Sequence, residues 1–578
     1  MKTPENSSII STRSHHADLV VVGGGLSGLF AAIAAARHGA GVILVQDRPM
    51  LGGNASSEIR MGIMGAHGDD NKETGLLEEV QLDNIYVNPL RRYTRWDDVL
   101  YSAVVREKNI TLLLNSSVHS VAMAGNRIRS VTAWNGNEYC SYLLSGDYFA
   151  DCSGDGILRL SGADFRIGRE APEEFGEHLT QVGNDKRTMG SSILLQLRHC
   201  SEHRPFIAPD WAYHFTEETI PKNRRLYPEN NNFWWIEYGG NIDTIGDANA
   251  IAFELKRIAY GVWEYMKNHP DGRCHNYELD WIGSLPGKRE SCRFIGDHLL
   301  TQDDITSGGL FPDVVCYGGW TLDDHHPDAF FTQGPQSLLH KTPSPFGIPY
   351  RCFYSRNVDN LFFAGRNISC THMGMSATRV MATCALMGQA VGTAAALCRR
   401  YECSPRDIGR EHIAELQDIL EDDDVMLPGR WRKVPAVTRE AQCSHEVVRD
   451  GIDRNWRGED HGAWVAPGEA ITLSWPTPQT LSACRVIFDS ELSFQGKRML
   501  KLEALEEFKP MPPMLAKRFH IDMLIDEEWR TIISQDQWHH RLFRQALPQQ
   551  PCRAIRLIAD ETWGGGEQKA HVFAYDVR

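Results

Sequence analysis

The sequence predicts an α/β domain built on a parallel sheet, with an α+β domain inserted into it and an all-β sandwich after it. Three observations predict this arrangement. An apolar, β-branched run at residues 18–22 leads through glycines into a helix-forming segment, and a second such strand follows at residues 42–46. Residues 360–397 again combine a strand, glycine and a helix, and beyond residue 440 short apolar runs alternate with turn residues. A chain of 578 residues is expected to hold two or three such domains.

The first glycine-rich turn, DLVVVGGGLSG, has the spacing of a dinucleotide-binding turn. Gly23, Gly25 and Gly28 stand in G-x-G-x-x-G register. In this register the first glycine permits the tight turn, the second lets the backbone approach a pyrophosphate, and the third lets the helix pack on the strand. The helix begins at Leu26 and Ser27, so we expect its N-terminus to face the phosphates. A tight turn without a ligand has the same pattern.

The strand after this helix departs from the usual pattern at its end. It closes on Gln46, where such folds usually place a carboxylate that accepts hydrogen bonds from an adenosine ribose. The Gln46 amide oxygen can accept the same bond, and Asp47 beside it could do so instead. The residues expected to continue this nucleotide-binding edge are Arg48, Gly52, Gly53, Asn54, Ala55 and Ser56.

Two later segments extend the similarity. YFADCSGDG supplies Asp151, Ser153 and Gly154, and NLFFAGRNIS supplies Gly365 and Arg366. Together with the glycine turn, they resemble the FAD-dependent oxidoreductases of the glutathione-reductase-like superfold. The resemblance implies an FAD-binding Rossmann-like domain in which the turn holds the FAD pyrophosphate, the second segment lies under the adenosine half and the third caps the flavin. LVQDRPMLGGNASSEIR and LPGKRESCRFIGDHLLTQDDI are similar to a bacterial branch with a galactose-binding-like tail.

These signals divide the chain into four parts. We expect a discontinuous FAD-binding domain at residues 17–165 and 347–425, a substrate domain at 166–346, a linker at 426–437 and a galactose-binding-like sandwich at 438–578. The substrate domain contains aromatic clusters and a helix-forming stretch at 248–269. The tail resembles jelly rolls that bind sugars or serve as packing modules, so glycan binding and homo-oligomer formation both stay open.

The catalytic candidates are groups that the resemblance implies lie near the flavin ring. A helix at about 376–398 is expected to aim N-terminal amides, around Gly374, Met375 and Ser376, at the pyrimidine edge of the flavin. His372, just before that helix, is the first candidate base because imidazole titrates near neutral pH. The second candidate, in MGIMGAHGDD, is His67. Either histidine could instead cap or pack beside a turn.

A basic stretch at residues 286–305 supplies another catalytic candidate. Its Arg289 and Arg293 could hold a carboxylate or sugar oxygen in fixed geometry, although an interior ion network is the slightly preferred explanation. Trp234 and Trp235 could stack a sugar ring, and core packing is the alternative for both.

Composition argues against several classes of function. The net charge of −15 argues against nucleic-acid binding. We expect no membrane span, because no apolar run approaches about 20 residues, and a cytoplasmic location, because the N-terminus lacks a signal-peptide core. The fourteen cysteines include no C-x-x-C pair and no zinc spacing, so we expect structural thiols and no metal.

The leading hypothesis is an FAD-dependent oxidoreductase, a dehydrogenase or oxidase. It would take hydride from a CH–OH carbon of a sugar, glycoside or similar small molecule onto flavin N5, with a histidine removing the hydroxyl proton. The electron acceptor is unidentified, because no second fingerprint for NAD(P)H is present. The alternatives are reduction of a C=C or ketone, redox-assisted glycoside cleavage, and glycan binding on a catalytically inactive scaffold.

Overall fold

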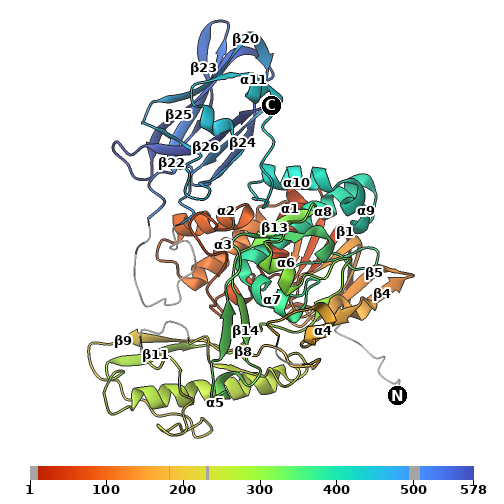
Figure 1. Cartoon of the computed structure of the whole chain (residues 1–578), viewed down its shortest axis with the longest axis vertical. Helices are drawn as coiled ribbons and strands as arrows, with labels where there is room; N and C mark the ends of the chain where they lie inside the picture. Colours follow the sequence, from red (N-terminus) through yellow and green to blue (C-terminus); the bar gives the residue numbers. More distant parts are fainter. Residues whose placement is uncertain (1–10, 181–182, 229–232, 494–507, 509) are drawn as a thin grey trace, which may run out of the picture. The chain divides into compact units, whose positions relative to one another are not determined.

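The chain forms two compact units, and Figure 1 labels many of their elements. The computed structural model describes residues 11–180, 183–228, 233–493, 508 and 510–578. Within these limits, the first unit contains residues up to Ala66 and Arg91–Leu416, and the second contains His67–Leu90 and the chain from Gln417 onward.

The first unit is built on a seven-stranded sheet. In spatial order its strands are β3 (Ile110–Leu113), β2 (Val42–Val45), β1 (Ser11–Val22), β6 (Cys140–Asp151), β5 (Arg127–Asn135) and β4 (Ser116–Ala124), with β17 (Leu361–Phe363) pairing with β6. β3, β2, β1, β6 and β17 pair in parallel, whereas β5 and β4 extend the sheet with antiparallel pairs. Every residue of β2 is buried, as expected for a parallel strand covered on both faces. The carboxyl ends of β1, β2, β6 and β17 therefore meet at one edge of the sheet, where open α/β folds bind ligands.

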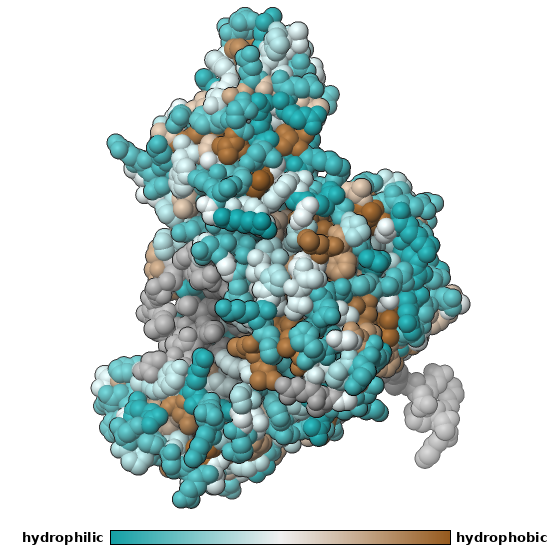
Figure 2. Space-filling view, viewed as in Figure 1, coloured by the Kyte–Doolittle hydropathy of each residue, from teal (hydrophilic) through white to brown (hydrophobic). Residues whose placement is uncertain are grey.

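Two apolar helices, α1 (Leu26–Arg37) and α8 (Met381–Tyr401), pack closely on each other. A Cβ added at Gly388 would lie only 2.0 Å from the carbonyl oxygen of Ser27, so glycine is what permits this approach. Among the described residues, α8 is the one helix long and apolar enough to cross a membrane, and 94% of its apolar window is buried inside the unit. The sequence expectation that no apolar run approaches membrane length does not hold for α8, but the expectation of no membrane span stays a prediction. On the face drawn in Figure 2, hydrophobic residues form small separate groups among hydrophilic ones.

The inserted part of the first unit is organised around α5 (Ala248–Lys267), close to the predicted helix. Ile251, Leu255, Ile258 and Val262 recur at helical spacing and are buried. They share a core with apolar residues of β9 (Leu195–His199), which pairs antiparallel with β11 (Tyr277–Ile282) beside α5 in Figure 1. The other elements of this part are β7 (Phe165–Arg166), α4 (Pro172–Phe175), β8 (Ser191–Ser192), β10 (Glu237–Tyr238), β12 (Arg293–Phe294), α6 (Gln302–Thr306), β13 (Val314–Gly318), β14 (Leu322–His325), η3 (Ala329–Phe331), β15 (Ser337–His340) and β16 (Phe346–Pro349).

The remaining elements of the first unit connect these parts. They are η1 (Gly53–Ala55), α3 (Tyr93–Val105), η2 (Ile157–Ser161), η4 (Tyr350–Cys352), α7 (His372–Thr378), α9 (Pro405–Glu411) and α10 (Ile413–Asp422), which runs on into the second unit. The helix predicted over about 376–398 is two helices, because α7 ends at Thr378 and α8 begins at Met381.

The second unit contains two antiparallel sheets. The first comprises β18 (Gln442–Cys443), β20 (Ala470–Thr480), β25 (Pro551–Thr562), β22 (Ala516–Ile525) and β23 (Glu528–Gln535), and the second β19 (Ala463–Val465), β26 (Ala570–Val577), β21 (Ala483–Phe488) and β24 (Leu542–Ala546). Alternate residues of β22, Phe519, Ile521, Met523 and Ile525, are buried in the shared core. The short helices α11 (Ala436–Glu440) and η5 (Glu446–Arg449) complete the sandwich, and the all-β prediction for the tail is borne out at this level.

The second unit also includes a segment from near the N-terminus. Helix α2 (Leu76–Val87) places Leu82 and Ile85 in the sandwich core. The sequence places this segment in the FAD-binding domain, whereas its contacts group residues 67–90 with the sandwich. Glu78, in the acidic first turn of α2, accepts hydrogen bonds from Ser490 and from Lys72. The sequence contains no signal for the contact with Ser490.

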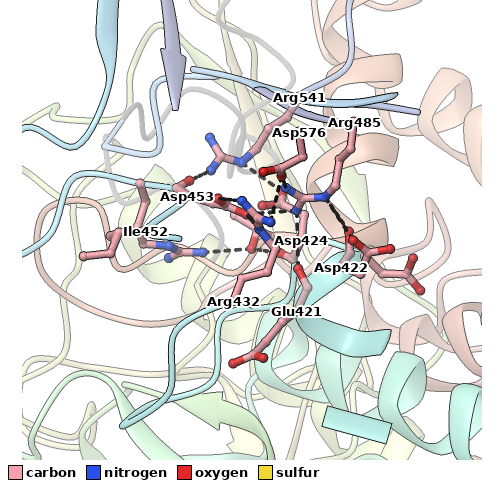
Figure 3. Close-up of polar contacts among 12 residues, drawn as sticks. Glu421, Asp422, Asp424, Arg432, Ile452, Asp453, Arg485, Arg541 and Asp576 are labelled. Atoms are coloured by element: carbon pink, nitrogen blue, oxygen red, sulfur yellow. Dashed lines mark hydrogen bonds and ion pairs between the residues drawn. The ribbon is translucent and has the colours of Figure 1, made fainter. Parts of the chain in front are cut away.

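The predicted linker at 426–437 is folded into the same unit. Arg432 lies between two carboxylates, with Nε 2.9 Å from Asp453 and Nη1 2.7 Å from Asp576. Arg485 also pairs with Asp453 at 2.9 Å, and Arg541 pairs with Asp424 at 2.9 Å. Figure 3 shows these guanidinium groups converging on the carboxylates. Because the network is buried, removing any one of these side chains would leave a buried charge without its partner.

Candidate active site

A cavity of about 760 Å³ opens at the carboxyl edge of the parallel sheet in the first unit. This volume lies within the roughly 300–1,000 Å³ typical of small-molecule sites. Many residues expected to bind the cofactor line it, and these are Gly23, Gly25, Leu26, Ser27, Gln46, Asp47, Arg48, Gly52, Gly53, Asn54, Ser153, Gly154, Gly365 and Arg366. Residues of the inserted part complete the wall, among them Trp234, Ala252, Leu285 and Arg289.

The glycine turn has the geometry that a pyrophosphate requires. Gly23 has φ +106°, and a Cβ there would lie 2.6 Å from the backbone of Cys152 and Ser153. A Cβ at Gly28 would lie 1.8 Å from the Gly23 carbonyl oxygen, so glycine is needed there for packing even though Gly28 does not line the cavity. At Gly25 a Cβ would meet no atom closer than 4.0 Å. Gly25 is also the N-cap of α1 and offers no side chain to the first-turn N–H groups, which leaves them available to an anion.

Gln46 serves the turn itself rather than the open cavity. Its Oε1 accepts from Gly24 N at 2.7 Å, and its Nε2 donates to Met50 O at 3.0 Å. The amide oxygen is thus already bonded, and the exposed Asp47 carboxylate is the better placed acceptor for a ribose hydroxyl. Arg48, also at the cavity, lies between Asp47 and Glu58 at 3.7 and 3.5 Å.

The segment after β6 is organised by a buried carboxylate. Asp151 Oδ1 accepts from Ser153 N and Oγ at 3.0 and 2.7 Å, and its Oδ2 accepts from Leu158 N at 2.6 Å. Asp151 therefore shapes the turn and does not line the cavity. Ala55 and Ser56 are likewise buried beside the cavity without lining it.

A second carboxylate holds the cations of this wall. Asp155 pairs with Arg366 at 2.8 Å and with Lys288 at 2.6 Å. Burial raises the pKa of Asp155, but the charges of Arg366 and Lys288 outweigh burial, so the pKa is lowered. Gly154 leaves room for this arrangement, because a Cβ there would lie 2.6 Å from the Arg366 guanidinium.

The helix end that faces the cavity is not the predicted one. Gly374, Met375 and Ser376 are buried within α7 and do not line the cavity. The N-cap of α8, Val380, and its first residue, Met381, do line it, and Val380 offers no side-chain cap. The helix N-terminus that lies at the cavity therefore belongs to α8, which begins at Met381 rather than at the expected position of about 376.

His372 does not fit the role of base expected for it. Its Nδ1 lies 3.0 Å from Glu290 and its Nε2 lies 2.9 Å from Asp324. Burial lowers the pKa of His372, but these two carboxylates outweigh burial and raise the pKa to about 10. The imidazole is therefore protonated at neutral pH and cannot accept a proton there. His372 also lies outside the cavity lining, and so does His67, which is exposed and belongs to the second unit.

Arg289 lines the cavity as a member of a charge cluster that the sequence did not reveal. Arg289 lies 3.5 Å from Glu237, which lies 2.6 Å from Nδ1 of His325. His325 Nε2 lies 3.3 Å from Asp323, whose other oxygen accepts from Arg379 at 3.1 Å. Burial lowers the pKa of His325, but Glu237 and Asp323 outweigh both burial and the repulsion from Arg289, so the pKa is raised.

This cluster gives one wall of the cavity a defined chemistry. Arg289, His325, Asp323 and Arg379 line the cavity, and Glu237 lies behind them, so the cluster carries a net positive charge when His325 is protonated. An oxygen that gains negative charge beside this wall would be stabilised. Of the four charged residues that line this wall, the sequence indicated Arg289 alone as a site candidate.

A match to a family model agrees with this geometry. A family model described as FAD dependent oxidoreductase matches residues 18–420. The chain is similar to a geranylgeranyl bacteriochlorophyll reductase-like protein from Thermoplasma acidophilum at 12% identity over 71% of this chain and 84% of that one, with a TM-score of 0.32. It is also similar to OxyS anhydrotetracycline hydroxylase from Streptomyces rimosus at 12% identity over 71% of this chain and 67% of that one, with a TM-score of 0.31.

The tail has a weaker similarity of its own. A chitosan-binding module of a chitosanase/glucanase from Paenibacillus sp. IK-5 is similar at 12% identity over 24% of this chain and 92% of that one, with a TM-score of 0.17. At these values the solved structures identify no substrate. No curated protein matches the chain.

The residues at the sheet edge fit FAD. The uncapped first turn of α1 offers N–H groups for a pyrophosphate, and Gly25 leaves the space in which that group would approach. Arg366 and the N-terminus of α8 supply positive charge beside the same cavity. Since the family model covers most of the chain, this protein belongs to the FAD dependent oxidoreductase family and is an FAD-dependent oxidoreductase.

Proposed function

We propose that the enzyme oxidises a CH–OH carbon of a sugar, glycoside or similar polyhydroxylated small molecule. The observation that carries this proposal is the charged wall of the cavity, where Arg289 and His325 lie among residues of the inserted part. FAD, when bound, supplies the hydride acceptor. The residues of this chain then need to bind the substrate and take up the hydroxyl proton.

His325 is the proposed proton acceptor. Glu237 holds Nδ1 at 2.6 Å, and Nε2, which lies 3.3 Å from Asp323, is the nitrogen that would exchange a proton at the cavity. Unlike His372, His325 lines the cavity. Although burial opposes the shift, the pKa of His325 is raised, chiefly by the charge of Glu237, so the neutral form of the imidazole becomes more abundant as pH rises. The oxidation rate should therefore rise with pH through the pKa of His325, because only the neutral imidazole can accept the proton. Arg289 would stabilise the oxygen as its proton leaves.

Two aromatic side chains support a ring-shaped, hydroxylated substrate. Trp234 and Trp320 line the same cavity as the charge cluster. The Trp234 ring meets His325 edge-on, with centroids 5.6 Å apart. A flat apolar ring next to hydrogen-bonding groups suits a sugar, which has both apolar C–H faces and hydroxyl edges.

The test is anaerobic reduction of the bound FAD by candidate substrates. Purified holoenzyme would be mixed with sugars, glycosides and sugar acids, and loss of the flavin absorbance would be followed over time. With the best reductant found, His325→Gln should slow the reduction by about 100-fold to 10,000-fold while FAD content stays the same. The pH dependence of the remaining rate should flatten in this variant.

The neighbouring histidine provides a matched control. His326 has a side chain that is 45% exposed and it does not line the cavity. The substrate should therefore reduce the FAD bound to His326→Gln at the wild-type rate. If His325→Gln also reduced FAD at the wild-type rate and with the same pH profile, His325 would not be the base.

One observation favours a second candidate function, the reduction of a ketone or C=C bond. The raised pKa of His325 favours its protonated form, which is a proton donor and suits the reverse reaction. Photoreduced enzyme mixed with ketones and enones would be reoxidised without oxygen if this direction operates. Product analysis would also reveal redox-assisted glycoside cleavage as a released aglycone.

For the second unit, sugar binding and homo-oligomer formation both remain predictions. Light scattering of the full chain and binding to immobilised glycans would distinguish the two roles.

A further inference from the structure

Three potential metal ligands meet in the second unit, outside the cavity described above. Asp83 Oδ1 lies 2.9 Å from His539 Nε2 and 2.8 Å from His540 Nε2. All three ligand atoms lie within 4.8 Å of one another, and this is the one such group of ligands among the described residues. Asp83 comes from α2, whereas both histidines lie between β23 and β24.

The hydrogen bonds of His539 specify which of its nitrogens faces the group. His539 Nδ1 lies 3.0 Å from the carbonyl oxygen of Gln537, and a carbonyl can only accept, so Nδ1 carries the hydrogen. In the neutral imidazole the lone pair is then on Nε2, which points at Asp83. Metal-binding histidines have this arrangement, with the far nitrogen donating to a backbone carbonyl.

We propose that Asp83, His539 and His540 bind a divalent ion of the zinc class. Imidazole nitrogen and carboxylate oxygen are both ordinary ligands of Zn²⁺. Without an ion, the contacts of His539 require hydrogens on both of its nitrogens, and His540 also needs a hydrogen on Nε2. An ion satisfies the three facing lone pairs together.

The size of the site requires only a small adjustment. Zinc binds nitrogen and oxygen at about 2.0–2.2 Å, and tetrahedral angles then place its ligands roughly 3.4 Å apart. The nitrogen–oxygen distances of 2.8 and 2.9 Å would each lengthen by about half an ångström. The side chains of Asp83, His539 and His540 are 9%, 20% and 22% exposed, so an ion can enter and water can take the fourth position.

Neighbouring rings hold the two histidines in place. Tyr86, one turn after Asp83 on α2, stacks on His539 with centroids 4.1 Å apart and planes 10° apart. Trp538 meets His540 edge-on at 5.4 Å. An ion here would therefore fasten α2 to the sandwich, across residues up to 457 positions apart in sequence. Cysteine and histidine spacing in the sequence carries no signal for ligands that lie so far apart along the chain.

The test uses the full-length protein without a histidine tag, treated with a chelator and dialysed. Zinc chloride alone would be titrated against a chromophoric chelator, and metal content would be measured by mass spectrometry. We expect about one tightly bound zinc per chain and a rise in the melting temperature on adding zinc. Asp83→Asn and His540→Gln should each weaken zinc binding by about 100-fold or more.

The control is a histidine–carboxylate pair without a second histidine. His214 lies 2.7 Å from Glu264, and His214→Gln should leave zinc binding unchanged. If a ligand variant fails to fold, X-ray absorption of the zinc-loaded wild type decides, because the proposal requires two imidazole ligands. Absence of stoichiometric zinc in the wild type, equal binding by the folded ligand variants, or fewer than two imidazoles would overturn it.

Discussion

Replacing Gly25 with alanine separates the stability of the first unit from its affinity for FAD. Gly25 has φ −64°, which alanine adopts easily, and the nearest atom to a new Cβ is the Cα of Gly53 at 4.0 Å. Replacing glycine with alanine at such a position stabilises the folded protein by about 0.4–1 kcal/mol, because the unfolded chain then has less conformational entropy to lose. Alanine is a worse N-cap than glycine by a similar amount, so the unfolding free energy without FAD should change by less than about 0.5 kcal/mol.

FAD binding should respond much more strongly to the same methyl group. The new Cβ occupies the space in which a pyrophosphate would approach the backbone, so the cofactor must withdraw from the N–H groups of Leu26 and Ser27. A hydrogen bond to a charged group contributes about 1.5–3 kcal/mol, so losing one weakens FAD binding by about tenfold to 150-fold. Flavin fluorescence during titration of the apoprotein measures this affinity, and thermal unfolding of the apoprotein measures stability.

Gly28→Ala is the matched comparison. Its Cβ would lie 1.8 Å from the Gly23 carbonyl oxygen, so this variant should lose about 1–3 kcal/mol or more of stability even without FAD. If Gly25→Ala bound FAD with wild-type affinity, the assignment of the phosphate position would be wrong. If the Gly25→Ala apoprotein were destabilised as much as the Gly28→Ala apoprotein, the space inferred around Gly25 would be wrong.

Two further predictions concern buried charges. The pKa of His372 is raised to about 10, so the stabilisation from its charge is fully present below about pH 6.5 and is lost as the pH rises toward 10. His372→Gln should therefore flatten the decline in the free energy of unfolding over that pH range. An equally steep decline in the variant would contradict this account, with urea unfolding as the measurement. In the second unit, Asp453→Asn should lower the unfolding free energy by about 3–5 kcal/mol, because it leaves Arg432 and Arg485 short of a carboxylate. Asp418→Asn, which removes pairs with the exposed Lys433 and with the partly exposed Arg430, should cost less than about 1 kcal/mol, and a loss equal to that of Asp453→Asn would contradict this account.

The glycine-containing turns at the carboxyl edge of the parallel sheet were predictable from sequence, because their geometry depends on residue type. Gly23, Gly28 and Gly154 occupy positions at which a Cβ would collide with backbone or with a guanidinium, so the glycines themselves mark the turn. The strands that precede these turns are continuous apolar runs, which short-range patterns detect well. Gln46 shows the limit of such patterns, since its position was predicted but its bonding to Gly24 and Met50 was not.

The charged residues of the site were not predictable in the same way. His372 has the chemistry of a base, but Glu290 and Asp324, which arrive from elsewhere in the chain, fix its proton. His325 draws its partner Glu237 from 88 residues away. Long-range pairing of this kind determines pKa values, and residue spacing carries no information about it. The break between α7 and α8 was missed for a simpler reason, because small residues on both sides read as one helix.

The placement of α2 has consequences for how the chain is made and how it can be cut. During synthesis, α2 leaves the ribosome early, whereas His540, the partner of its Asp83, is 457 residues further along. At about 5–20 residues per second, that interval lasts roughly 20 to 90 s, during which Leu82 and Ile85 have no sandwich core to enter. A recombinant fragment that begins near residue 417 would lack α2 and expose the apolar surface that it covers. We therefore expect such a fragment to aggregate, and co-expression of residues 67–90 with it to restore solubility.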